Sequence, residues 1–248
     1  MRYCNKIRSL FIFLLLQFVF VKITLAQPGS GGISDLNNSQ QFLADASGKP
    51  LNLRVEYNVQ GTPFFPADYS LANLFMQNGK AYRGIKVKFN LNDNTLLYIT
   101  SDNQEMILTT PVNKVVFTDT SLGGIVKDIV FENGFTSVDE QNNLTYYQVL
   151  DSGKVMLLKH TRVDYQDKKE YGSATITREF SPNDFWYLRL PDGSMKKVEK
   201  GKEAILLLLP SHKAEMSKFI DANNLKCRKE SDWEKIIASY NSISSATN

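Results

Sequence analysis

The chain has 248 residues, of which 42% are hydrophobic and 22% charged, so it is long enough to bury a sizeable core. Its two cysteines exclude a small scaffold held by several disulfides. With 29 Lys and Arg against 26 Asp and Glu the formal net charge is +3, and this excess of positive charge lies at one end of the chain.

The first 26 residues have the three parts of a secretory signal peptide. Cations precede an apolar run over 10–21, and the small side chain of Ala26 ends the segment. The apolar run is too short to span a bilayer comfortably as a helix. We therefore expect cleavage before Gln27, no integral membrane span after cleavage, and an exported protein that is periplasmic, outer-membrane-associated or extracellular.

Removing this segment changes the charge balance of the chain. Its four cations, Arg2, Lys6, Arg8 and Lys22, leave 25 basic against 26 acidic residues, a net charge of about −1. Net charge then gives no support to nucleic-acid binding. Cys227 is the cysteine that remains, so an internal disulfide is excluded, and we expect a partly buried structural thiol.

Residues 27–49 are rich in Gly, Ser, Asn and Gln and have almost no apolar periodicity. This composition predicts a flexible leader before the folded part of the chain. From Leu51 to Tyr57, apolar residues alternate with polar ones, which is typical of a half-buried strand. We expect an antiparallel β domain to begin there and to cover 50–200.

Turn residues divide this predicted domain into short strands. Asn78-Gly79, between 74–76 and 82–89, is the strongest short hairpin signal in the chain. Further strands are expected at 95–100, 105–109, 112–118, 125–131, 144–150, 154–163, 185–190 and 195–198. This spacing predicts a mainly β fold, an antiparallel meander, barrel or sandwich with a short C-terminal helical segment.

The pattern becomes helical over 201–248, a segment that we expect to pack on the β domain. A short apolar helix at 202–209 is followed by a helix that Ser211 would cap, and Ser231 with Glu234 forms a capping box before a third. In that third helix Trp233, Ile236, Ile237 and Tyr240 recur at helical spacing and predict one apolar face: the face that docks.

Several of these segments also resemble an uncharacterised group of exported β-rich proteins of Bacteroidota. The similarity lies in Gly61–Phe65, Asn78–Asn90, Phe185–Leu188 with Pro191–Gly193, and the tail around Phe219–Lys226 and Trp233–Ser242. It covers most of 50–243 and implies a Gram-negative envelope location. It implies no activity and transfers no catalytic residue.

The residues that usually carry catalysis are sparse. The two histidines, His160 and His212, lack a nucleophile elbow or a zinc-type spacing around them. Asn92–Asn94 and Asp164–Asp167 offer oxygen ligands, but turn chemistry explains both. The sequence therefore predicts no catalytic residue, no metal site and no cofactor, and an enzyme is the less favoured interpretation.

Aromatic residues supply the candidate binding surface. Phe64, Phe65, Tyr146, Tyr147 and Trp186 could line a ligand pocket or a stacking surface. The competing interpretation is that aromatic residues on strands form core and cross-strand pairs. Within this set, the loop 61–66 is the favoured exposed surface, because loops carry function more often than strands.

Three functional hypotheses remain open at this point. The favoured one is a non-enzymatic envelope protein, a binding or assembly module whose partner is an envelope protein or a small ligand. The alternative is a carboxylate-dependent hydrolase on a β scaffold, which requires two close carboxylates with perturbed pKa values. The third is an integral outer-membrane protein, which requires strands of about 10 residues with apolar lipid-facing side chains.

Overall fold

A computed structural model of the chain describes residues 36–37, 42–43, 45–50, 57–122, 125–169, 171 and 175–246. The predicted signal peptide (1–26) and the predicted strand residues 51–56 lie outside the described residues.

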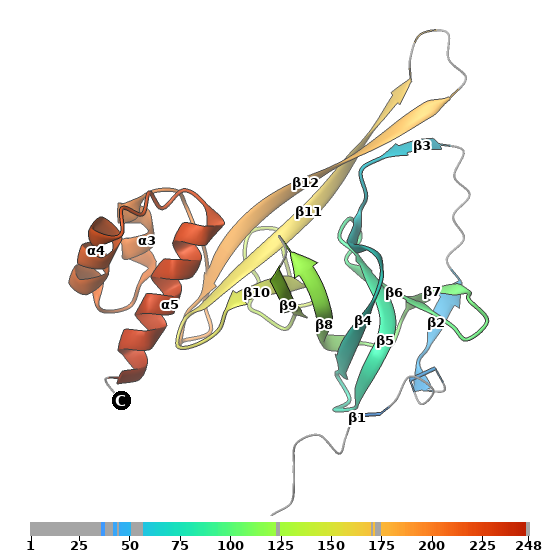
Figure 1. The fold of residues 1–248 in the computed structure, drawn as a ribbon, viewed down its shortest axis with the longest axis horizontal. Helices are drawn as coiled ribbons and strands as arrows, with labels where there is room; N and C mark the ends of the chain where they lie inside the picture. The colour runs from blue at the N-terminus through green and yellow to red at the C-terminus, as the bar shows by residue number, and fades with distance from the viewer. Residues whose placement is uncertain are drawn as a thin grey trace, which may run out of the picture. The chain divides into compact units, whose positions relative to one another are not determined.

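The described chain is mainly β, as the sequence predicts (Figure 1). The strands are β1 (Leu36–Asn37), β2 (Gly48–Pro50), β3 (Tyr57–Gln60), β4 (Phe64–Met76), β5 (Ala81–Asn90), β6 (Thr95–Ile99), β7 (Glu105–Leu108), β8 (Val112–Leu122), β9 (Ile125–Glu132), β10 (Tyr147–Asp151), β11 (Met156–Lys169), β12 (Ile176–Arg189) and β13 (Met195–Lys197). The helices are α3 (Lys202–Leu208), α4 (Lys213–Ala222) and α5 (Glu230–Ala246).

These strands form one open mixed sheet. Its order is β13-β12-β11-β10-β9-β8-β4-β5-β6-β7-β2, so β13 and β2 stand at its two ends. Neighbours along this path are antiparallel, whereas β1 pairs with β5 and β3 pairs with β12 in parallel. The path consists of two meanders, β4 to β7 and β8 to β13, joined side by side where β4 pairs with β8.

The Asn78-Gly79 hairpin is confirmed, and its geometry shows why it forms. Gly79 adopts a positive φ of 83° and donates its N–H to the Met76 carbonyl. The Asn78 side chain accepts from the Lys80 N–H at 3.1 Å. Because Gly has no Cβ, it adopts this left-handed backbone without steric cost.

The described residues of the segment 27–49, which the sequence predicts to be a flexible leader, pack on the sheet. Phe42 is fully buried, with its ring 5.3 Å from the rings of both Tyr82 and Tyr98. β1 and β2 add to the sheet through β5 and β7. Burial of one large aromatic side chain contributes about 2–3 kcal/mol, and the pairing of β1 and β2 adds to it in a segment that lacks periodicity of its own.

Several strands are longer than the turn signals suggest. β4 begins at Phe64, inside the loop 61–66 that we expected to be an exposed surface, and Pro63 in that loop is buried. β11 and β12 have 14 residues each, whereas the predicted strands end at Val163 and begin at Phe185. The extra residues are mostly polar and form strands because they pair with each other.

The C-terminal helices pack on the strands of the second meander. Their shared cluster joins Val155 of the β10–β11 turn and Leu157 and Leu188 of the strands to Trp233 and Tyr240 of α5, all buried. The predicted apolar face of this last helix is confirmed, because Trp233, Ile236, Ile237 and Tyr240 are 0–1% exposed. Cys227 is likewise buried in this cluster.

The helix starts differ from the predicted ones. α4 begins at Lys213 with His212 before it in a left-handed conformation, and the Ser211 hydroxyl lies 2.9 Å from the Tyr240 hydroxyl instead of capping the helix. α5 begins at Glu230, so Ser231 lies inside it and forms no capping box. For Ser211, a tertiary contact replaces the predicted local cap.

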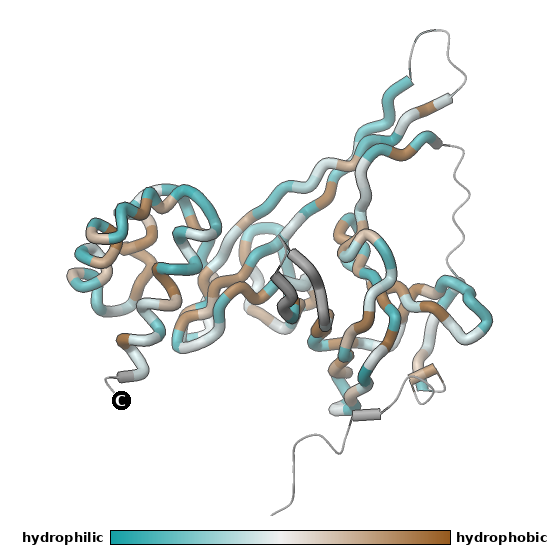
Figure 2. The backbone as a smooth tube through the Cα atoms, in the orientation of Figure 1, coloured by the Kyte–Doolittle hydropathy of each residue, from teal (hydrophilic) through white to brown (hydrophobic). Residues whose placement is uncertain are grey.

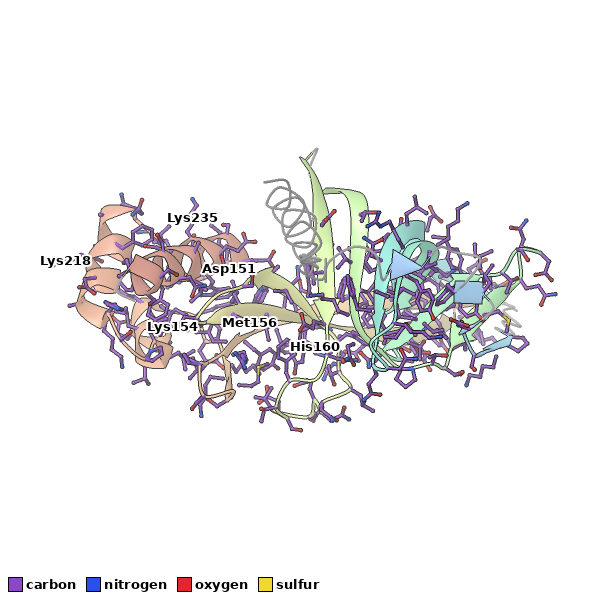
Figure 3. All side chains as sticks on the ribbon, turned by 90° about the horizontal axis from the view of Figure 1, so that it is seen from below. Asp151, Lys154, Met156, His160, Lys218 and Lys235 are labelled. Carbon is purple, nitrogen blue, oxygen red and sulfur yellow. The ribbon has the colours of Figure 1, made fainter. Side chains whose placement is uncertain are left out.

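Asn241 of α5 fastens the β10–β11 turn to the helices. Its amide donates to the Val155 carbonyl and to Asp151, and its oxygen accepts from the Val155 N–H. A Cβ on Gly153 would lie 2.6 Å from this side chain, so only glycine permits the contact. Figure 3 shows Asp151 at this turn, beside the helices that carry Lys218 and Lys235.

Candidate interaction surface

The five aromatic residues of the predicted binding surface do not come together. Phe65 and Tyr146 pack against a core cluster that spans both meanders, Tyr147 belongs to a second buried cluster, and Trp186 packs at the helix–sheet interface. Phe64 lies elsewhere, with the Lys88 ammonium over its ring. The structure therefore does not gather these residues into one surface, and most of them lie in core and interface clusters.

Phe65 and Tyr146 are linked through core rings. Phe65 packs on Phe131, which contacts Phe89, and Phe89 contacts Tyr146 at a centroid distance of 5.0 Å. The Tyr146 hydroxyl donates to the Val112 carbonyl at 2.6 Å, and burial raises its pKa. A hydroxyl that is already bonded inside the core is not available to a ligand.

Tyr147 is 1% exposed and packs edge-on against Tyr187, whose hydroxyl donates to Asp139 at 2.9 Å. Burial, assisted by the negative charge of Asp139, raises the pKa of Tyr147 to about 12. Lys197 pairs with the same carboxylate at 3.5 Å. These contacts fasten the connection between β9 and β10 onto β12 and β13.

Trp186 joins the sheet to α5. Its ring lies 4.9 Å from that of Trp233, and its indole N–H donates to Glu230 at 2.9 Å. Lys159 pairs with the same carboxylate at 3.0 Å. This arrangement satisfies the polar end of a large aromatic side chain at an internal interface.

Phe64 takes part in an aromatic arrangement that holds a charge. The Lys88 ammonium lies 4.3 Å from the centre of the Phe64 ring and 4.4 Å from that of Tyr69. Glu105 accepts from it at 3.2 Å, and burial and this carboxylate raise the pKa of Tyr69. Cation–π contacts and an ion pair together stabilise a mostly buried ammonium.

The feature that extends away from these clusters is the distal part of the β11–β12 hairpin, 160–169 paired with 176–185. We call it the arm. β10 pairs with β11 up to Lys159, and the β11–β12 ladder continues to Lys169 opposite Ile176. β3 lies along β12 at 176–179, so the far part of the arm has three strands (Figure 1).

The arm is held by side chains that cross its own ladder. Arg178 binds Asp167 through two hydrogen bonds of 2.7 and 2.8 Å, which lowers the pKa of that carboxyl. The Arg178 guanidinium also lies 4.0 Å from the centre of the Tyr165 ring. Lys168 pairs with Glu179, and these contacts replace the apolar packing that other strands have.

Large apolar side chains are nevertheless exposed here. Val59 of β3, Tyr165 of β11 and Tyr171 at the tip are 52%, 46% and 108% exposed. Figure 2 shows the arm as a largely hydrophilic stretch of chain, drawn mostly in teal. Three exposed apolar residues on one polar arm mark it as a candidate interaction surface.

The sequence does not predict the arm because its strands lack alternating apolar residues. The one available signal is the pairing of Asp167 with Arg178, which face each other, and of Lys168 with Glu179, which lie diagonally, and these pairs become visible only when the register is known.

Among the described residues, no three side chains of His, Cys, Asp or Glu gather closely enough to hold a metal ion. None of the described helices combines the length and apolar content needed to cross a membrane.

The fold and surface define a class, an open mixed β-sheet protein with a docked helical tail and a polar arm. Comparison of the chain with protein-family models, with curated proteins and with solved structures found no match. Membership of the exported Bacteroidota group therefore stays a prediction.

Proposed function

We propose that this protein is an exported, non-enzymatic binding or assembly module of the cell envelope, and that the arm is its docking element. The observation that carries the proposal is the exposed arm itself. The arm presents backbone groups and apolar side chains at the surface of the molecule. The large buried clusters lie elsewhere, in the sheet and the helices.

The proposed location rests on the first 26 residues, with their cations, short apolar run and small residue before Gln27. The resemblance to exported proteins of Bacteroidota supports the same location. A periplasmic, outer-membrane-associated or extracellular site is compatible with this signal.

The physical argument for docking concerns the stability of the arm. An isolated strand pair is marginal in water because it buries too little apolar surface to offset its ordering. Ion pairs between exposed side chains contribute about 0–1 kcal/mol each. A partner that covered Val59, Tyr165 and Tyr171 would add the apolar burial that the arm lacks.

The hydrolase alternative has less to support it. Burial raises the pKa of the Asp151 carboxyl, but this side chain accepts a hydrogen bond from Asn241, which holds the β10–β11 turn on α5. No observation on the described residues brings a second carboxylate to it as an acid–base partner. We therefore do not propose a hydrolase.

An arm-shortened variant tests the proposal. In this variant Tyr165–Phe180 is replaced by Asn-Gly, a two-residue turn that joins the paired residues Asp164 and Ser181, whose backbone groups can close it. Wild-type protein and variant, produced by export of the full chain, are each cross-linked in envelope fractions, and proteins recovered with the wild type alone are purified and titrated directly.

The expected result is saturable binding of a purified envelope component to the wild type and at least tenfold weaker binding to the variant. Equal binding to both proteins, or recovery of nothing but the protein itself as a monomer, would overturn the proposal. Circular dichroism of the variant controls for folding.

A further inference from the structure

The edge of β11 that faces away from β12 has no described strand beside it beyond Lys159. β10 pairs with β11 through Leu157–Lys159, and the ladder with β12 occupies the other edge up to Lys169. The Val163 carbonyl accepts from the Asn92 side chain at 2.6 Å, which places it on the edge away from β12.

Backbone groups alternate between the two edges of a strand, so Tyr165 and Asp167 present their N–H and C=O groups to the same edge as Val163. A strand edge of this length is a template for pairing with another strand. We infer that its occupant is the same edge of a second copy of this chain, in an antiparallel arm-to-arm dimer. The inference rests on the proposed function, since it names the partner of the arm.

Symmetry limits the register of such a dimer. Two antiparallel copies of one edge are related by a two-fold axis perpendicular to the sheet, which leaves each residue on its own face. Residues opposite one another must therefore share a face, which means that they differ by an even number of positions. In each allowed register the two-fold axis therefore passes beside a single residue, which lies opposite itself in the other copy.

Charge selects among these registers. Centred on Gln166, the pairing sets Asp164 of each copy opposite Lys168 of the other, twice by symmetry. In the register centred on Tyr165, Arg162 lies opposite Lys168 of the other copy. In the register centred on Asp167, this residue lies opposite itself. Opposite charges across a ladder stabilise it and like charges destabilise it.

The Gln166 register also extends interactions that each arm already contains. Within one chain Arg162 pairs with Asp164 at 3.2 Å, and Lys168 pairs with Glu179. The two new Asp164–Lys168 pairs would link these into networks that run across both arms. On the opposite face Tyr165 would lie against the Asp167 of the second copy, which Arg178 already holds.

A cysteine at the two-fold axis gives the sharpest test. In the selected register Gln166 lies opposite itself in a pair without mutual hydrogen bonds, where Cα atoms are about 4.5 Å apart and a disulfide fits. Q166C, made in the full chain and exported, should form a covalent dimer under mild oxidation. S181C is the matched control, because Ser181 is exposed on the same arm but lies on β12.

Charge reversal supplies the second measurement. D164K and K168D should each weaken self-association at least tenfold in sedimentation equilibrium, because each sets like charges opposite. The double variant D164K/K168D should recover the wild-type association, which excludes an unfolded arm as the cause of the single effects.

The inference is overturned if Q166C cross-links no faster than S181C, or if the double variant does not recover the dimer. A monomeric chain whose arm still binds an envelope component overturns this inference and leaves the proposed function standing. A dimer that survives shortening of the arm overturns the inference and removes the arm from the interface.

Discussion

Lys88 carries its charge between two aromatic rings and pairs with a more exposed carboxylate. The Lys88 side chain is 11% exposed and that of Glu105 39%. Loss of Glu105 should therefore cost more stability than loss of Lys88. A carboxylate left alone can be hydrated, whereas the buried ammonium cannot.

We expect Glu105→Ala to destabilise the protein by about 2 kcal/mol, since it leaves the buried ammonium without a counter-ion. Lys88→Met keeps the packing against Phe64 and Tyr69 and should cost less than about 1 kcal/mol. Urea unfolding of both variants gives the comparison. Equal losses would show that the ion pair is effectively exposed.

His160 supplies a pH-dependent contribution to stability. Burial lowers its pKa, Arg162 acts in the same direction, and a hydrogen bond with the Tyr146 backbone and the charge of Asp184 oppose them. Figure 3 places His160 along β11, beyond Asp151 and Met156. The ordinary pKa of histidine is about 6.5.

Because the pKa is lower in the folded state, protonation favours the unfolded chain. The contribution of His160 is fully present above about pH 6.5 and is lost as the pH falls from there through the folded-state pKa. His160→Gln should flatten the dependence of unfolding free energy on pH in this window. His212→Gln is the control, and an unchanged slope in His160→Gln would contradict the assignment.

At the scale of elements, the arm is a strand pair whose stability comes from its own ladder. The large buried side chains of the core lie outside Tyr165–Phe180. We therefore expect the unfolding free energy of the arm-shortened variant, measured in urea, to stay within about 1 kcal/mol of the wild-type value, since no core cavity is created. A loss of several kcal/mol would show that the arm is part of the folding unit.

The arm also shows the limit of reading elements from sequence. Asp164–Lys169 contains one apolar residue, Tyr165, so the pattern predicts a turn with oxygen ligands instead of a strand. The strand exists because Asp167 meets Arg178 and Tyr165 meets Phe180 across the ladder. Such a match depends on which segments become neighbours, and periodicity within a segment does not report it.

At the scale of the whole molecule, the helices and the second meander share one buried cluster. The two tryptophans of the chain, Trp186 and Trp233, both lie in this interface. Their fluorescence therefore reports docking of the helices on the sheet.

We expect the transition in tryptophan fluorescence to coincide with the loss of far-ultraviolet circular dichroism in urea, because the shared cluster couples the two parts. Trp233→Ala should lower the unfolding free energy by about 3–5 kcal/mol without separating the two transitions. A fluorescence change at lower urea than the dichroism change would show that the helices undock independently.

The sequence by itself determined the mainly β class, the hairpin at Asn78-Gly79 and the apolar face of the last helix. These features depend on local backbone preference and on periodicity within one segment. Only the tertiary structure decided that β4 joins the two meanders, that Phe42 enters the core, and that the five predicted aromatic residues separate among buried clusters and a lysine contact. The same holds for the arm, because strand register, burial and ion pairing arise between segments that are distant in the chain.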